Sequence, residues 1–179
     1  MGLSGASARR PRWHAAAAGV LAALVLTAGC GQGQRPRTHG SFTAGGVNVA
    51  VTLERSGAHT VAVSATLRPQ RAGFHVYSLT LPDAGVDGLG IPTRLSVGGP
   101  LTAEGPVTAS ARPHGLHMAD LDVTLPVYPD GPVTLRLTAR LSGKGAAEAP
   151  VRLGYGACSA TQGCLMPVRD RVLAVDVPG

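Results

Sequence analysis

Cys158 and Cys164 are the two residues whose type and spacing could carry chemistry beyond packing. They frame a short segment of small and polar residues, CSATQGC, between two stretches with strand-like patterns. If those strands pair, the cysteines lie close enough for a disulfide, whose Cα atoms are usually about 5.5–6 Å apart. The third cysteine, Cys30, belongs to a distant N-terminal segment, so an even pair remains for an oxidising compartment.

This cysteine pair has two chemical interpretations. As a structural bond, it closes a loop of about seven residues and stabilises the fold by roughly 2–2.5 kcal/mol. As a redox pair, it exchanges with partner thiols through a mixed disulfide. The spacing is not C-x-x-C, and no neighbouring lysine or helix N-terminus is expected to lower a thiol pKa. The residues alone therefore favour the structural bond.

A second group of candidate residues, His114, His117 and Met118, lies about 40 residues earlier. Together with the two cysteines and Met166 they offer thiolate and thioether ligands, which suit Cu(I). A polar loop with one methionine packed inward explains the same residues without a metal, and we predict no cofactor. The sequence has no G-x-S-x-G, H-E-x-x-H or P-loop pattern, so it does not support a hydrolase or a nucleotide-binding protein.

Alternating apolar and polar residues predict the elements that position the cysteines. Turn signals rich in Gly and Pro separate these stretches, and no stretch after residue 45 has an apolar period of 3.6. The pattern predicts a single all-β domain, an antiparallel β-sandwich. Clear strands are expected within residues 47–53, 61–67, 133–141, 151–155 and 173–177, and weaker ones within 74–81, 93–97 and 121–127.

Residues 1–29 have the organisation of a signal peptide, with an arginine-rich start, an apolar run over 15–26 and small residues before Cys30. The segment resembles the lipobox of bacterial lipoproteins, although Thr27 stands where leucine is usual. The resemblance implies that Cys30 carries a diacylglycerol and anchors the chain to the extracytoplasmic face of the cell membrane. The polar, Gly-rich residues 30–45 then predict a flexible tether, followed by a domain over residues 46–179.

Charge and composition narrow the expected partners. The net charge of +6 falls to +3 when Arg9, Arg10 and Arg12 leave with the signal peptide. The remaining basic residues are scattered and aromatic residues make up only 3%, so we predict no nucleic-acid partner. We expect a monomer whose membrane contact is its lipid anchor.

Several stretches resemble the N-terminal extracytoplasmic domain of the thiol–disulfide interchange protein DsbD family. The segment FHVY at 74–77, followed by GIPT at 90–93, is similar to that family's aromatic-His-hydrophobic-Tyr and Gly-x-Pro-Thr stretches. The LPV segment at 125–127 before a GPVTL strand is also similar. The pieces cover about residues 47–177. The most specific one is a strand followed by Tyr-x-x-Cys-x5-Cys-Leu-x-Pro, matched by Tyr155, Cys158, Cys164, Leu165 and Pro167.

The resemblance implies an immunoglobulin-like β-sandwich with a redox-active cysteine pair at one end. In the family the pair accepts electrons from a thioredoxin-like partner and passes them to other extracytoplasmic thiol proteins, and Cys164 would form the mixed disulfide. The counterpart of the family's cap loop is Arg112–Met118, which lacks the family's acidic and aromatic cap residues. With the resemblance, exchange is favoured over a structural disulfide in an interaction or adhesion domain. We expect His114, His117 or Met118 to contact a bridge at the surface.

The anchor is tested by metabolic labelling with a fatty-acid analogue. Cys30→Ala should abolish the label and release the protein from membranes, because it removes the thiol that would carry the lipid. Cys164→Ala is the matched control and should keep the label. A native chain that stays unlabelled contradicts lipidation and leaves simple secretion.

Overall fold

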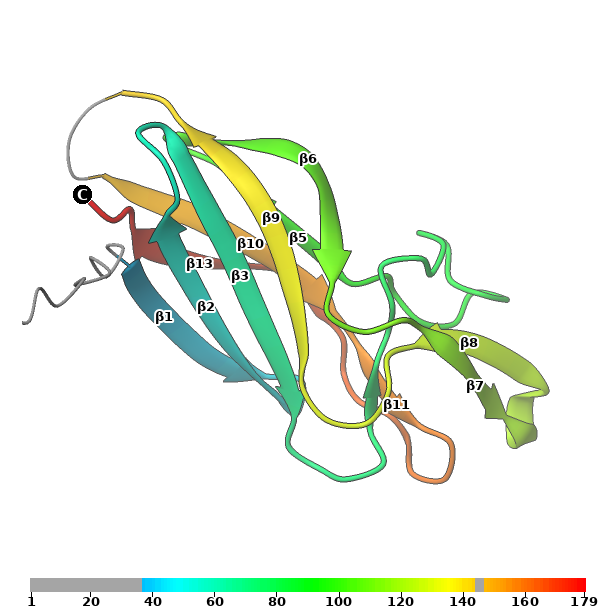
Figure 1. Cartoon of the computed structure of the whole chain (residues 1–179). Helices are drawn as coiled ribbons and strands as arrows, with labels where there is room; N and C mark the ends of the chain where they lie inside the picture. Colours follow the sequence, from blue (N-terminus) through cyan, green and yellow to red (C-terminus); the bar gives the residue numbers. More distant parts are fainter. Residues whose placement is uncertain (1–36, 144–146) are drawn as a thin grey trace, which may run out of the picture. The chain divides into compact units, whose positions relative to one another are not determined.

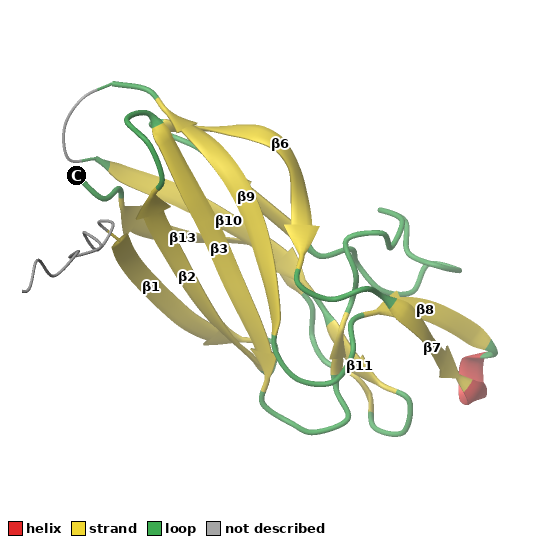
Figure 2. Ribbon diagram, viewed as in Figure 1, coloured by secondary structure: helices red, strands yellow, loops and turns green. Residues whose placement is uncertain are grey.

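The computed structural model describes residues 37–143 and 147–179, which belong to one compact unit. They form an antiparallel immunoglobulin-like β-sandwich (Figures 1 and 2). One sheet has the order β1-β2-β3-β9-β6, and the opposing sheet has the order β13-β10-β5. The first comprises β1 (Arg37–Ala44), β2 (Val47–Arg55), β3 (Thr60–Pro69), β9 (Val133–Leu141) and β6 (Leu101–Ala109), and the second β13 (Val168–Asp176), β10 (Glu148–Tyr155) and β5 (Arg94–Val97).

The core of the sandwich follows directly from the alternation in the sequence. Every second residue of β2 from Val47 to Leu53 is fully buried, and the intervening side chains face outward. The central strands β3 and β9 show the same period. Successive side chains of a strand point to opposite faces, so this pattern places one apolar face against the other sheet. All five clear strand predictions are confirmed.

The prediction of a flexible tether through residue 45 is wrong for residues 37–44. This segment forms strand β1, paired with β2 over its whole length from Arg37↔Glu54 to Ala44↔Val47. Its polar residues concealed the strand because β1 has no fully buried side chain. Backbone pairing, the packing of Phe42 against the core and a hydrogen bond from the Tyr155 hydroxyl to the Ala44 carbonyl hold it in place. Residues 1–36, including Cys30, lie outside the described residues.

Three further segments build one end of the molecule. Strands β12 (Gly163–Cys164), β11 (Ala157–Ser159) and β4 (His75–Val76) form a small sheet. Strands β7 (His114–Met118) and β8 (Val123–Val127) form a hairpin closed by the short 3-10 helix η1 (Ala119–Leu121). Figure 1 shows β7, β8 and β11 together at the end opposite the C-terminus. A second, smaller apolar cluster lies there, apart from the main core.

Sequence patterns predicted this end least well. The weak strand expected over residues 74–81 is a strand only at His75–Val76, because the chain then turns through Ser78 and Thr80, whose hydroxyls bond to each other.

The sequence patterns also missed β6, the edge strand of the five-stranded sheet. This strand has a single buried residue and a register shift between Glu104 and Thr108. No helix in the described part of the chain is long and apolar enough to cross a membrane.

Candidate functional site

Cys158 and Cys164 form a disulfide across the hairpin of β11 and β12. The two residues are direct cross-strand partners, with their Cα atoms 4.0 Å apart. The chain reverses over residues 160–162 and re-enters the ladder at Gly163, whose φ of 76° lies in the region that glycine adopts without strain. The predicted connection between the paired strands β10 and β13 is thus a hairpin of its own, stapled at its base.

The two cysteines differ in exposure. Cys158 is completely buried, in the second apolar cluster with Leu125 and Val127. Cys164 is exposed and lines an open cavity of about 190 Å³. Thiol–disulfide exchange requires a thiolate to reach one sulfur while the other leaves. If the bridge takes part in exchange, the burial of Cys158 would make Cys164 the sulfur that is attacked and Cys158 the leaving group.

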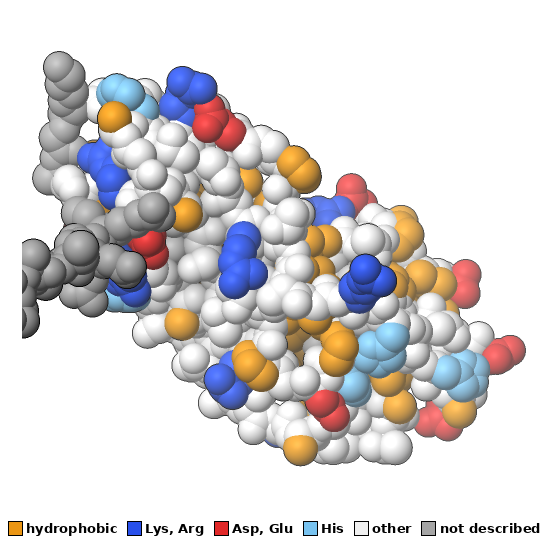
Figure 3. Space-filling view, in the orientation of Figure 1, with side chains coloured by type: hydrophobic (Ala, Val, Ile, Leu, Met, Phe, Trp, Pro, Cys, Tyr) orange, Lys and Arg blue, Asp and Glu red, His pale blue; other side chains and the backbone are white. Residues whose placement is uncertain are grey.

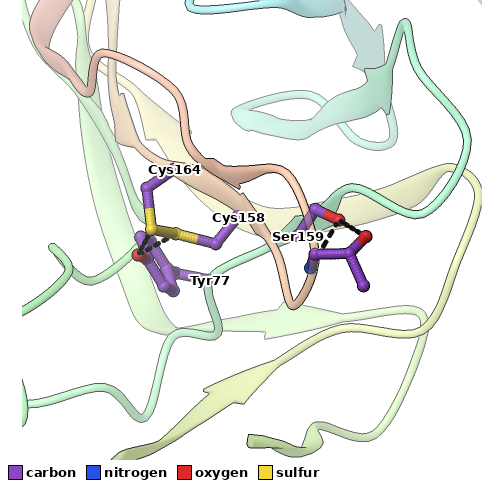
Figure 4. Close-up of a disulfide and its surroundings, with 5 residues drawn as sticks. Tyr77, Cys158, Ser159 and Cys164 are labelled. Atoms are coloured by element: carbon purple, nitrogen blue, oxygen red, sulfur yellow. Dashed lines mark hydrogen bonds between the residues drawn. A yellow bond between two sulfur atoms is a disulfide. The ribbon is translucent and has the colours of Figure 1, made fainter. Parts of the chain in front are cut away.

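Tyr77 contacts both sulfurs (Figure 4). Its hydroxyl lies 2.5 Å from Cys158 Sγ and 3.3 Å from Cys164 Sγ. Neither sulfur of a disulfide carries a hydrogen, so the phenol is the donor. Burial raises the pKa of Tyr77 above its ordinary value of 10.0, and the hydroxyl keeps its proton at neutral pH. A phenol in this position can also donate to a thiolate at Cys158.

Strand pairing explains why Tyr77 lies here. His75 of β4 is the direct partner of Cys158, and Tyr77 follows two residues later, so its side chain points to the same face. The Tyr77 backbone N–H donates to the Gly156 carbonyl at 3.0 Å and extends the ladder. Tyr77 belongs to the FHVY segment that resembles the DsbD family, but the sequence gives it no role. The available signal was the spacing of two residues from His75, which has meaning only once the register with Cys158 is known.

Two glycines make room for the Tyr77 ring. A Cβ on Gly156 would lie 2.8 Å from the ring, and a Cβ on Gly90 would lie 3.1 Å from it. The ring is 3% exposed and cannot move aside without disturbing its neighbours. These close approaches hold the phenol against the disulfide.

The turn between β1 and β2 supports the segment after Cys164. A Cβ on Gly46 would meet the Leu165 side chain at 2.5 Å, and a Cβ on Gly45 would meet the Met166 carbonyl at 2.7 Å. The φ angle is 69° at Gly46 and 54° at Gly45, so glycine is favoured at both positions by conformation as well as by space. The strand that we predicted to be a tether therefore ends against the hairpin that carries the disulfide.

The structure places the three cap candidates on strand β7, not in a loop. Met118 belongs to the buried cluster of Cys158 and lines the cavity of Cys164, so it lies beside the bridge. The ring of His114 packs edge-on against His75, the cross-strand partner of Cys158, with centroids 5.5 Å apart. His117 instead faces the hydroxyl of Thr124 on the hairpin. Figure 3 shows histidine and hydrophobic side chains gathered at this end of the surface.

The contacts of His75 position strand β4 and do not direct its imidazole toward the sulfurs for acid–base chemistry. Its Nδ1 donates to the Tyr128 carbonyl at 3.0 Å, and its Nε2 lies 3.6 Å from an Asp130 carboxylate oxygen. These contacts tie β4 to the segment that follows β8. Among the described residues, no group of three or more His, Cys, Asp or Glu side chains is arranged to hold a metal ion.

Comparison with known proteins supports the fold. No family model matches the chain, and no curated protein matches it. Among solved structures, the chain is similar to the N-terminal periplasmic domain of ScsB from Proteus mirabilis, with a TM-score of 0.54 and 13% identity. The match covers 80% of this chain and 51% of that one, so the chain spans about half the length of that structure. A weaker similarity, with a TM-score of 0.40 and 5% identity, is to the GAE domain of GGA2p from Saccharomyces cerevisiae.

The contact between Tyr77 and the sulfurs predicts an effect of Gly156→Ala. The added methyl group overlaps the Tyr77 ring, so we expect a loss of about 1–3 kcal/mol in the free energy of unfolding. Gly154→Ala is the matched control, because a Cβ there meets only ordinary contacts at 3.7 Å or more. Chemical denaturation measures both variants. Equal stability would show that Tyr77 is not confined in this way.

Proposed function

We propose that this protein is an extracytoplasmic thiol–disulfide exchange module that passes electrons between partner proteins through Cys158 and Cys164. The observation that carries the proposal is the asymmetry of the bridge. One sulfur is exposed, and the other is buried against a phenol that can stabilise it as a leaving thiolate. A bond serving only as a staple needs neither feature. The fold shared with a periplasmic domain and the resemblance to the DsbD family support the same function.

The exchange runs in two balanced steps. A partner thiolate attacks Cys164 Sγ, a new disulfide forms between them, and the Cys158–Cys164 bond breaks with its electron pair on Cys158. A second thiolate of the partner then attacks the partner sulfur of this mixed disulfide and releases Cys164 as a thiolate. The partner leaves oxidised, and the pair is reduced by two electrons. The reverse sequence delivers the electrons to an oxidised acceptor, so donor and acceptor are both thiol proteins, the donor being thioredoxin-like.

Tyr77 acts in the first step as a hydrogen-bond donor to the departing sulfur. A hydrogen bond to a charged group contributes about 1.5–3 kcal/mol, and burial makes a bare thiolate at Cys158 costly. The contact between the Tyr77 hydroxyl and Cys158 Sγ is present before the bond breaks. The site therefore needs little rearrangement to accept the developing charge.

A lipid anchor at Cys30 is part of the proposal, and the path of β1 suits it. The strand begins beside the end of β13, where the Thr38 hydroxyl donates to the Asp176 carbonyl. It ends at Gly45 and Gly46 against the residues that follow Cys164. Eight residues of strand span about 26 Å. A chain held at a membrane through Cys30 would thus enter the domain at the end far from the disulfide, which leaves the bridge available to partners.

Single-cysteine variants test the assignment of the attacked sulfur. In a Cys30→Ala background, Cys158→Ser leaves the exposed Cys164, and Cys164→Ser leaves the buried Cys158. We expect Cys164 to react with an aromatic disulfide reagent at least about 10-fold faster, since access controls attack. In cells, Cys158→Ser should trap partners in complexes that reductant dissolves, and Cys164→Ser should not. The absence of adducts, with a reduction potential of the native bridge below about −300 mV, would identify a structural bond.

Tyr77→Phe tests the role of the phenol. Loss of the hydrogen bond should slow reduction of the bridge by dithiothreitol about 10-fold and raise the pKa of the Cys158 thiol by about 1 unit, which corresponds to about 1.4 kcal/mol. Tyr128→Phe is the control, because that buried hydroxyl accepts from the Leu79 N–H at 3.1 Å and does not touch sulfur. It should reduce stability without changing the exchange rate or the thiol pKa. Equal rates for Tyr77→Phe and the native protein would remove Tyr77 from the mechanism.

A further inference from the structure

The cavity beside Cys164 is apolar except at one point. It is bounded by the residues that follow Cys164, by the 88–91 segment and by the tip of the β7–β8 hairpin. Its one charged lining residue is Arg169, at the start of β13. In the described part of the chain, the structure gives Arg169 no hydrogen bond or carboxylate partner, and its side chain is exposed. An arginine without a carboxylate partner is available to a charge on another molecule.

A second cavity, of about 310 Å³, adjoins the first. The two share Ile91 and Arg169 in their linings, and we refer to the two cavities together as the groove beside Cys164. The second cavity adds two arginines, each already paired: Arg94 with Asp83 at 2.5 Å and Arg152 with Asp170 at 3.1 Å. The net charge along the groove is therefore positive, and the unpaired positive charge is that of Arg169.

Exposed apolar side chains flank the same sulfur. Only three large hydrophobic residues are exposed in the described part of the chain, and two of them, Met166 at 82% and Leu121 at 56%, lie at this end. Leu121 lines the cavity of Cys164, and Met166 is two residues from that cysteine along the chain. Apolar surface of this kind around a reactive group suits a polypeptide, because a small thiol would leave most of it uncovered.

We infer that the groove binds an extended segment of the partner thiol protein in which apolar residues flank the reactive cysteine and a nearby carboxylate pairs with Arg169. This inference rests on the proposed exchange function and adds a specificity-determining residue to it. Arg169 is not a catalytic residue, since it selects the segment whose thiolate reaches Cys164. Its planar guanidinium can bind a carboxylate through two parallel hydrogen bonds, which orients the segment as well as attracting it.

The test uses the chain with Cys30→Ala and Cys158→Ala, activated at Cys164 as the mixed disulfide with thionitrobenzoate. Release of the coloured thiol reports attack by synthetic peptides that carry one cysteine, flanking leucines and a single Glu, Gln or Lys. Each peptide's rate of reaction with the activated protein is divided by its rate of reaction with the free aromatic disulfide reagent. This ratio removes differences in reactivity between the peptide thiols. We expect the Glu peptide to react about 3-fold faster than the Gln peptide and about 10-fold faster than the Lys peptide at low salt.

Variants of the arginine give the decisive comparison. Arg169→Ala should abolish the preference, and Arg169→Glu should reverse it in favour of the Lys peptide. Arg136→Ala is the matched control: this arginine lies in a separate groove across the five-stranded sheet, and its loss should leave the preference intact. Raising the salt concentration should weaken the native preference, because the pair is exposed to solvent.

The outcomes separate this inference from the exchange function itself. Reaction of all three peptides at equal corrected rates would overturn the role of Arg169 while exchange at Cys164 stands. Glutathione serves as a small thiol with carboxylates. If Arg169→Ala slowed glutathione as much as the Glu peptide, the assignment to a polypeptide segment would be wrong. Failure of every thiol to displace the label from Cys164 would contradict the exchange function.

Discussion

The contact between the Tyr77 hydroxyl and the sulfurs of Cys158 and Cys164 is the interaction on which the site depends. It joins two separate stretches of chain, because Tyr77 directly follows β4 and the β11–β12 hairpin carries the bridge. A phenol buried in an apolar cluster must find a hydrogen-bond partner, or it costs free energy. Here the partners are the two sulfurs. The same constraint that satisfies the phenol would also provide a donor for the thiolate that forms in the proposed exchange.

The rest of the molecule holds this contact in place from several directions. Gly156 and Gly90 leave just enough room for the Tyr77 ring, and the turn at Gly45 and Gly46 packs against the residues after Cys164. His75 ties β4 to the Tyr128 carbonyl beyond β8. These supports lie in turns and loops that the strands hold in place, so the bridge is packed against the rest of the domain on several sides and does not belong to an independent loop. A rigid support of this kind favours a defined line of attack on one sulfur.

The difference in burial between the two cysteines determines which of the two sulfurs is accessible from solvent. A pair with both sulfurs buried would resist all thiols, and a pair with both exposed would exchange with any thiol that met it. In the proposed exchange, burying Cys158 and exposing Cys164 would let the surface around one sulfur select the partner. That surface combines apolar side chains such as Met166 with the positive charge of Arg169. For the partner that we propose, apolar contact would supply affinity and the charge would supply selectivity, which is a common division at protein interfaces.

The sequence by itself determined the sandwich. The period of two in β2, β3, β9 and β10 reflects burial of one face, and this local pattern needs no knowledge of partners. It also placed both cysteines at the junction of two paired strands. It misassigned β1 because that strand has no buried side chain, and the backbone pairing that holds it there leaves no trace in a hydropathy pattern. Only the tertiary structure shows that Cys158 is buried and Cys164 exposed. It also shows that Tyr77 donates to the sulfurs and that Arg169 lies beside Cys164. Each depends on which strands lie side by side and in which register, and register is a long-range property that spacing along the chain does not encode.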